Sequence, residues 1–363
     1  MDAALARLVD QVQTARAAKG KLRIVGGDTK AFYGNAASGE PLDVKPLAGI
    51  SSYEPSELVV TVRAGTLLEE LEATLAEQGQ CLAFEPPRFV SRGTVGGIVA
   101  AGLAGPSRAA VGGVRDHVLG ATLLNGRGEV VSFGGQVMKN VAGYDVSRAL
   151  AGSMGTLGVI AEVSLKVLPV APATATIRFE CAQAEALKRL NTWGGEPLPI
   201  SASAWWNGML VLRLAGARAA VEAATTQLGG EAIDAPLAAT FWRGLRDHGD
   251  EFFAGAAKAE DGGAALWRLG LPQTAAPITL PGEQLVEWGG AQRWLCTSAS
   301  ADAVRDAATK AGGHATLWRG GGDKKRVGAF HPLPAAQARI QRALMDAFDP
   351  DRVFDRARLW PPA

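Results

Sequence analysis

Hydrophobic residues in the first 170 positions follow two spacings in turn, that of a helix and that of a strand. Between residues 5 and 12, leucine and valine recur on one helical face with charged residues between them. This spacing predicts an amphipathic first helix and argues against a secretion signal. Apolar runs at residues 21–27 and 58–63 predict strands, and the first of them ends in paired glycines. This part of the chain is therefore expected to mix strands with helices.

Three further segments carry local signals. Thr66 and Glu69 have capping-box spacing before a helix whose leucine stripe stops at Gly79. The Asn-Gly-Arg-Gly sequence at 125–128 lies between two apolar runs, which predicts a hairpin. Every second residue from 159 to 167 is apolar, which predicts a half-buried strand.

The pattern changes after residue 170, where strand, helix and strand recur in two halves. This order is typical of an α+β domain whose mostly antiparallel sheet is covered by helices. All three tyrosines precede residue 150 and all nine tryptophans follow residue 190, which also suggests two units. Most tryptophans fall on predicted strands, where core packing is expected, and the alternative is an apolar face for a partner subunit. A last helix is predicted over 335–348.

Composition and charge exclude several classes of function. The 363 residues carry 37 basic and 36 acidic side chains, a net charge of +1, so no strong field exists to hold nucleic acid or an anionic membrane. Cys81, Cys181 and Cys296 lie far apart and the four histidines are scattered, which excludes an iron–sulfur or zinc site made by this chain alone. No uninterrupted run of 18 apolar residues predicts a transmembrane helix, and the chain is expected in the cytoplasm.

Glycine is abundant, at 45 residues, and four clusters of it lie in the first 170 positions. Glycine loops let backbone N–H groups converge on an anion, which suits a diphosphate. Any one cluster can be an ordinary turn, but four together favour a phosphate-bearing ligand. A strand follows the Gly152, Gly155, Gly158 series, which is the wrong context for a Rossmann loop. The sequence also contains no P-loop and no GxSxG motif.

Six segments together make the sequence recognisable. They are RIVGGDTKAFYG, EPPRFVSRGTVGGIVAAGLAGPSR, GGVRDHVLGATLLNGRGEVVSFGG, VMKNVAGYDVSRALAGSMGTLGVIAEVSLKVLP, EWGGAQRW and AFDPDRVFDRARLW. Their order resembles the vanillyl-alcohol oxidase/PCMH flavoprotein superfamily. Within it, the chain is most similar to the FAD-binding subunits of bacterial glycolate oxidases, also called glycolate dehydrogenases, over nearly its whole length.

The resemblance implies the fold class and the domains. Residues 1–170 are expected to form a PCMH-type FAD-binding domain of two subdomains, within an α+β architecture. An α+β cap domain with a mostly antiparallel sheet follows over 171–330, after a join rich in proline and small residues. Residues 331–363 are expected to form a C-terminal helix and tail that return to the FAD domain.

The resemblance also places the cofactor. The first glycine loop would wrap the FAD diphosphate, the second would pass along the ribityl chain and isoalloxazine, the third would continue that wall, and the fourth would close over the adenosine half. The residues concerned are Val25, Gly26, Gly27, Asp28, Thr29 and Lys30, then Thr94, Val95, Gly96 and Gly97, then Gly112, Gly113, Arg115 and Asp116, and finally Gly155, Thr156, Gly158, Val159 and Ile160. In this reading Lys30 is the one nearby cation, and a solvated surface position is its alternative.

Two positions depart from the family pattern. Members that bind FAD covalently carry a histidine just after the first glycine pair, where this chain has Thr29, so a non-covalent FAD is expected. The closing motif reads Phe354-Asp355-Arg356-Ala357-Arg358 in place of the family's Asn-Pro-Gly sequence. The family's contacts at that place are therefore not carried over.

The catalytic relatives carry a histidine-rich, metal-binding segment, and this chain has no match to it. His331-Pro332 is followed by Leu333-Pro334, so no metal site is expected. The catalytic residues stay unknown. Lys139 and Tyr144 are candidates because the family places this run close to the flavin, with a purely structural role as the alternative.

The resemblance implies an FAD-binding subunit of a glycolate (2-hydroxy acid) dehydrogenase complex that takes part in oxidising glycolate to glyoxylate. The expected partners are a companion flavoprotein subunit and an iron–sulfur subunit, through which a cytoplasmic chain could lie at the inner membrane. One alternative is a self-sufficient FAD-dependent oxidoreductase for another hydroxy acid or alcohol. Another is a scaffold that has lost its flavin, against which the intact glycine loops argue.

Overall fold

The computed structural model describes residues 2–135, 145–320 and 327–359, which fall into two compact units. The first unit is made of the described residues of Met1–Leu103, Gly113–Pro169 and Pro332–Ala363. The second unit is made of those of Ala104–Gly112 and Val170–His331. Both units combine helices with sheets that are almost entirely antiparallel, which confirms the predicted α+β class.

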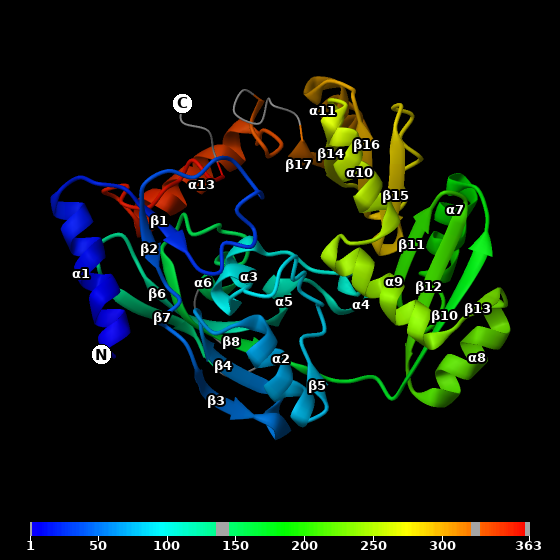
Figure 1. The fold of residues 1–363 in the computed structure, drawn as a ribbon, viewed down its shortest axis with the longest axis horizontal. Coiled ribbons are helices and arrows are strands. Elements are labelled where there is room, and N and C mark those ends of the chain that lie inside the picture. Colours follow the sequence, from blue (N-terminus) through cyan, green and yellow to red (C-terminus); the bar gives the residue numbers. More distant parts are fainter. Residues whose placement is uncertain (1, 136–144, 321–326, 360–363) are drawn as a thin grey trace. The chain divides into compact units, whose positions relative to one another are not determined.

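The first unit contains a five-stranded antiparallel sheet, in the order β3-β4-β8-β6-β7, and a parallel pair, β1-β2 (Figure 1). Its strands are β1 (Leu22–Val25), β2 (Glu40–Asp43), β3 (Ile50–Glu54), β4 (Val59–Arg63), β5 (Gln80–Cys81), β6 (Val118–Leu124), β7 (Val130–Gly134), β8 (Val159–Lys166) and β9 (Leu168–Pro169). Its helices are α1 (Ala3–Ala17), α2 (Leu68–Glu77), α3 (Val95–Ala101), α5 (Val114–His117), α6 (Val146–Ala149) and α13 (Ala335–Phe348), with a 3-10 turn η1 (Pro55–Glu57).

Most local signals of the first unit are confirmed. Leu8 and Val12 of α1 are buried against β1, β2 and the C-terminal tail, as the helical spacing predicts. The hairpin forms, with β6 paired to β7 and the Asn125 side chain accepting hydrogen bonds from the backbone of the turn. Helix α13 has the predicted bounds.

Two details of the prediction are wrong. Thr66 does not cap α2, because its hydroxyl accepts a hydrogen bond from the Gly49 N–H (2.9 Å) and donates one to the Gly49 carbonyl. The helix begins instead after Leu67, which has no side-chain cap. Strand β8 is more than half-buried, because it lies between β4 and β6 and Ser164 on its polar face pairs with the Thr61 hydroxyl of β4.

The second unit is built on an eight-stranded antiparallel sheet in the order β13-β10-β12-β11-β15-β16-β14-β17 (Figure 1). Its strands are β10 (Ala173–Glu180), β11 (Ile200–Trp206), β12 (Met209–Gly216), β13 (Glu231–Ile233), β14 (Ala265–Gly270), β15 (Glu283–Glu287), β16 (Gln292–Thr297) and β17 (His314–Gly320). Its helices are α4 (Arg108–Val111), α7 (Gln183–Trp193), α8 (Arg218–Leu228), α9 (Ala235–Asp247), α10 (Glu251–Asp261) and α11 (Ala301–Lys310), with a 3-10 turn η2 (Trp288–Gly290).

Five tryptophans of the second unit are buried, namely Trp242, Trp267, Trp288, Trp294 and Trp318. Trp267 joins the core under α11, and Trp294 and Trp318 stack edge to face on the opposite side of the same sheet.

The domain bounds predicted from the sequence place residues 104–112 in the first domain, but this segment lies in the second unit. The Trp288 indole N–H donates to the Gly105 carbonyl (3.0 Å), and the Arg108 guanidinium lies 4.6 Å from the centre of the Trp288 ring.

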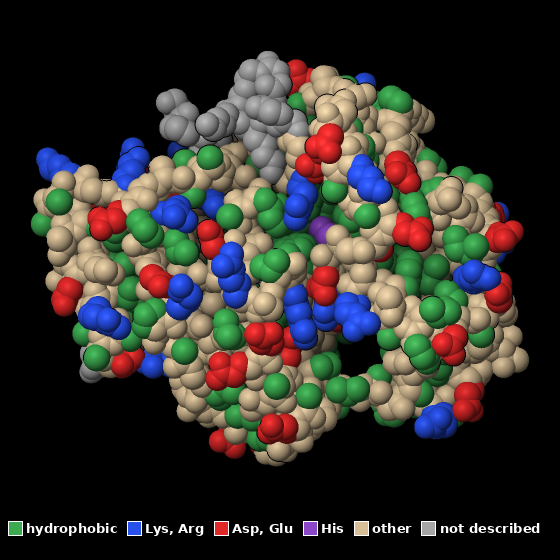
Figure 2. All heavy atoms as spheres, viewed as in Figure 1, with side chains coloured by type: hydrophobic (Ala, Val, Ile, Leu, Met, Phe, Trp, Pro, Cys, Tyr) green, Lys and Arg blue, Asp and Glu red, His purple; other side chains and the backbone are tan. Residues whose placement is uncertain are grey.

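On the face drawn in Figure 2, basic and acidic side chains are interspersed on both units, in keeping with the near-zero net charge. Of the helices in the described ranges, none combines the length and the apolar character that crossing a bilayer requires.

Candidate functional site

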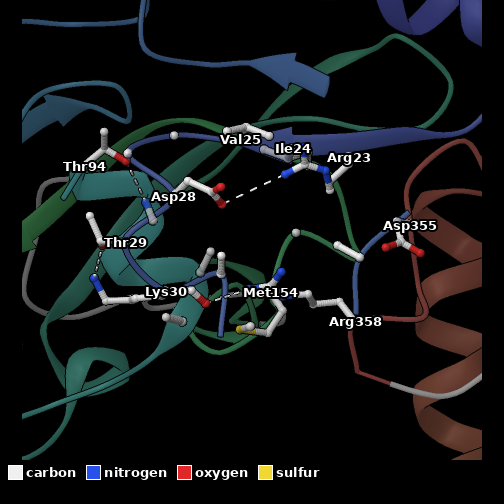
Figure 3. Close-up of a pocket in the computed structure, with 18 of the residues that line it drawn as sticks. Arg23, Ile24, Val25, Asp28, Thr29, Lys30, Thr94, Met154, Asp355 and Arg358 are labelled. Atoms are coloured by element: carbon white, nitrogen blue, oxygen red, sulfur yellow. Dashed lines mark hydrogen bonds and ion pairs between the residues drawn. The ribbon is translucent and has the colours of Figure 1, made fainter. Parts of the chain in front are cut away.

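A cavity in the first unit opens beside the first glycine loop (Figure 3). It encloses about 760 Å³ of atom-free space, part of which is open to solvent. Its wall comes from β1 and the loop that follows, from Thr94 and helix α3, from the turn at Met154–Gly155, and from the C-terminal tail. Of the predicted cofactor-binding residues, Val25, Gly26, Gly27, Asp28, Thr29, Lys30, Thr94, Gly97 and Gly155 line it.

The paired glycines are required because the loop packs directly on its neighbours, the Arg92 backbone at Gly27 and the Thr94 side chain at Gly26. A Cβ atom on Gly27 would lie 1.7 Å from the carbonyl oxygen of Arg92, and one on Gly26 would lie 2.4 Å from the Thr94 hydroxyl. The next residue, Asp28, has a φ of 55°, in the left-handed region. The loop therefore presents main chain to the cavity, as an anion-binding loop does.

The turn before β8 reaches the cavity because it is tied to α3. The Gly152 and Met154 N–H groups donate to the carbonyls of Val99 and Ala100 at 3.0 and 2.9 Å. Gly155 has a φ of 78°, and a Cβ atom there would lie 3.2 Å from Ile24 of β1. This contact brings Gly155, which lies far from the first glycine loop in the sequence, next to the strand that leads into that loop.

Three charged residues of the cavity wall, Arg23, Asp355 and Arg358, were missed by the sequence analysis. In Figure 3, Arg23 and Asp28 lie along one side, and Arg358 and Met154 lie along the other. Arg23 and Asp28 form an ion pair of 4.0 Å, and Arg358 donates to the Lys30 carbonyl at 2.7 Å. Lys30 is therefore not the one nearby cation, and the closing motif does contact the site.

Lys30 itself is a buried side chain and not a solvated one. It is 8% exposed, its ammonium lies 3.3 Å from the Thr29 hydroxyl and 5.7 Å from the centre of the Phe89 ring. Burial lowers the pKa of the Arg358 guanidinium, while the neighbouring carboxylates of Asp28 and Asp355 raise it. The wall thus carries three cations and two carboxylates, a balance that favours an anionic ligand.

The other predicted cofactor-binding residues do not line this cavity. Asp116 caps its own short helix by accepting from the Gly113 N–H at 2.8 Å. Lys139 and Tyr144, the candidate catalytic residues, lie outside the described residues. The remainder, which stay predictions, are Val95, Gly96, Gly112, Arg115, Thr156, Gly158, Val159 and Ile160.

The second unit contains a separate cluster of buried polar groups. Glu287 is 3% exposed and accepts hydrogen bonds from the Trp294 indole (2.7 Å) and the Gln292 amide (2.8 Å). Burial raises the pKa of Glu287 to about 7 and that of Asp250 to about 6. Within the described ranges, no three His, Cys, Asp or Glu side chains gather as they would around a metal ion.

Comparisons with known proteins identify the family and the cofactor. Residues 4–134 match a family described as FAD binding domain. The glycolate oxidase subunit GlcE of Escherichia coli is 43% identical over 353 residues, which cover 97% of this chain and 96% of that protein. A D-lactate dehydrogenase of Anaerostipes hadrus is 34% identical over 146 residues, 39% of this chain and 30% of that protein.

A solved structure of an alkyldihydroxyacetonephosphate synthase has the same fold. It superposes with a TM-score of 0.62 at 15% identity and covers 96% of this chain and 73% of that one. The FAD-binding resemblance predicted from the motifs is confirmed, and FAD is the cofactor of this chain. The chain belongs to the family of the glycolate oxidase subunit GlcE.

Proposed function

We propose that this chain is the FAD-binding subunit of a glycolate oxidase (glycolate dehydrogenase) complex and takes part in the oxidation of glycolate to glyoxylate. The observation that carries the proposal is the 43% identity to GlcE over 97% of the chain. Bound FAD would supply the acceptor for the two electrons that leave the hydroxy acid. The protein's part is to hold the cofactor and to pass its electrons to a partner subunit.

We place the diphosphate end of FAD in the cavity beside the first glycine loop. The observations that support this placement are main chain facing the cavity at Gly26 and Gly27, the three basic side chains in its wall, and the turn at Gly155. This chain has Thr29 where members that bind FAD covalently carry a histidine, and we infer from this that FAD is held non-covalently.

We infer the partner subunits from the redox group that this chain lacks the ligands to bind. Its three cysteines lie far apart in the sequence, which leaves no ligand set for an iron–sulfur cluster. Electrons leaving the flavin therefore go to an iron–sulfur subunit, and a companion flavoprotein carries out the principal oxidation. The complex is cytoplasmic, and any attachment to the inner membrane runs through those partners.

The test is to purify the full chain alone and together with its native neighbours. The isolated chain should bind about one FAD and turn over glycolate slowly, whereas the complex should contain iron and reduce an acceptor dye with glycolate. Rapid glycolate turnover by the isolated chain would refute this division of labour.

A self-sufficient oxidoreductase for another hydroxy acid is the second candidate. The partial match to D-lactate dehydrogenases and to a D-2-hydroxyglutarate dehydrogenase of Xanthomonas citri pv. viticola (32% identity over 140 residues) supports it. Stopped-flow reduction of the bound flavin by a panel of hydroxy acids, in the isolated chain, separates the two candidates.

A further inference from the structure

The end of the chain is built into the wall of the cavity. Beyond α13 the backbone runs parallel to β1, since the Leu22 N–H donates to the Val353 carbonyl (2.7 Å) and the Asp355 N–H donates to the Leu22 carbonyl (3.0 Å). Val353 and Phe354 are buried, each 1% exposed. The tail thus forms an isolated parallel bridge, Leu22–Phe354, with the strand that leads into the first glycine loop.

The same tail is fastened to the far end of that loop. The Asp355 carboxylate accepts from the Ser38 N–H (2.8 Å) and the Ser38 hydroxyl (3.3 Å). The Asn35 backbone N–H donates to the Arg358 carbonyl (3.0 Å), and its side-chain amide donates to the Ala357 carbonyl (2.9 Å). These contacts fix the backbone of residues 355–358 and so the direction in which Arg358 points.

The Arg358 guanidinium is mostly buried and has spare donors. Of the five N–H groups of an arginine, one donates a hydrogen bond to a residue of the described ranges, at the Lys30 carbonyl. Among the described residues no carboxylate lies within 4.0 Å of it, whereas Arg23 has Asp28 at that distance. Asp355, the nearest acid in the sequence, has both carboxylate oxygens engaged by Ser38 and by the Ala357 N–H.

Partial burial makes the charge of Arg358 costly, and the carboxylates of Asp28 and Asp355 offset that cost without a direct ion pair. An anionic ligand in contact with the spare donors would offset it further. Figure 3 shows Arg358 reaching from the tail across to the loop along the cavity wall. We propose that Arg358 binds the diphosphate of FAD and that the tail, residues 353–358, is the part of the site that presents it. The inference rests on the proposed placement of FAD in this cavity.

The experiment compares FAD affinity in the full-length apoprotein and three variants, by the quenching of FAD fluorescence on binding. Arg358→Gln removes the charge, Arg358→Lys keeps it, and Arg352→Gln makes the same charge change at an exposed place in the same tail. A charged hydrogen bond lost from the diphosphate should raise the Kd of Arg358→Gln by about ten- to a hundredfold. Arg358→Lys should recover part of this, and Arg352→Gln should match the wild type.

Two nucleotide fragments separate a charge contact from a structural latch, because ADP carries the diphosphate and adenosine does not. In competition against FAD, Arg358→Gln should weaken the binding of ADP and leave that of adenosine at the wild-type level, whereas a distorted loop should weaken both alike. A Kd of Arg358→Gln for FAD within threefold of wild type, an equal loss in Arg352→Gln, or an equal loss of ADP and adenosine binding would each overturn the proposal. If wild-type apoprotein does not bind FAD at all, it is the proposed function that fails.

Discussion

Replacing Gly27 by alanine gives the sharpest test of how the first glycine loop holds the cofactor. The new Cβ would lie 1.7 Å from the Arg92 carbonyl oxygen and 2.7 Å from its carbon, and both are main-chain atoms that cannot rotate away. Since real Cβ atoms do not come closer than 3.0 Å to such neighbours, the loop must move by about 1.3 Å. Overpacking of this kind costs about 1–3 kcal/mol of folding free energy.

A displacement of that size would also remove the contacts that we propose between the loop and the diphosphate. Hydrogen bonds to a charged group contribute about 1.5–3 kcal/mol each. The loss of one such bond should therefore raise the Kd for FAD about ten- to a hundredfold, and the loss of two should raise it further. The assay is flavin retained per chain after gel filtration, followed by FAD titration of the apoprotein and urea unfolding.

The matched control is Gly20→Ala, just before β1. There the nearest atom to a new Cβ is a carbonyl oxygen at 3.7 Å, an ordinary contact, so flavin content and stability should stay at the wild-type level. If Gly27→Ala retained stoichiometric flavin and unfolded at the wild-type urea concentration, the close approach of the loop to Arg92 would not be what shapes the cofactor site.

Three other outcomes are expected. Because burial raises the pKa of Glu287 to about 7 from 4.5, the folded state holds its proton more tightly than the unfolded chain, and stability falls as pH rises from about 4.5 to 7. At pH 8, Glu287→Gln should recover up to about 3 kcal/mol of the lost free energy of unfolding, and at pH 4 it should leave stability unchanged. Urea unfolding at a series of pH values measures both, and equal effects at pH 4 and pH 8 would contradict this reasoning. Thr94→Ala removes the side chain that accepts from the Gly97 N–H at the start of α3, so it should cost about 1 kcal/mol, whereas Thr94→Ser should retain the cap. Denaturing the holoprotein in acid should release all flavin from the polypeptide, and a chain mass increased by one flavin would refute non-covalent binding.

Local signals predicted the elements whose cause is local. The stripe in α1 and the turn at Asn125 specify structure through neighbours a few residues away, and both formed as expected. Thr66 failed as a helix cap because Gly49, 17 residues earlier, takes its hydroxyl. Likewise the segment at 104–112 looks like a continuation of the glycine-rich domain, but Trp288 binds its backbone from 183 residues away.

The residues of the candidate site also differ in whether a local pattern in the sequence marks them. Glycine is imposed at position 27 by the approach of the Arg92 main chain and at position 26 by the Thr94 side chain, so this part of the site can be recognised in the sequence as a motif. A cation needs only a long side chain that reaches the cavity, which many positions in a fold can supply. Arg23 comes from β1 and Arg358 from the far end of the chain, and neither has a local pattern to mark it.

This division has a consequence for how the site assembles. The first glycine loop is bounded on one side by Arg92 and Thr94 and on the other by the tail at Asp355, so its shape depends on segments more than 300 residues apart, as in the 317-residue separation of Ser38 and Asp355. Contacts of such sequence separation form late, because closing a long loop costs entropy before the contact repays it. A chain that ends before Val353 would keep the glycine motif intact and still lack part of the cavity wall, because the bridge between Phe354 and β1 and the Arg358 side chain that donates to the Lys30 carbonyl would both be gone.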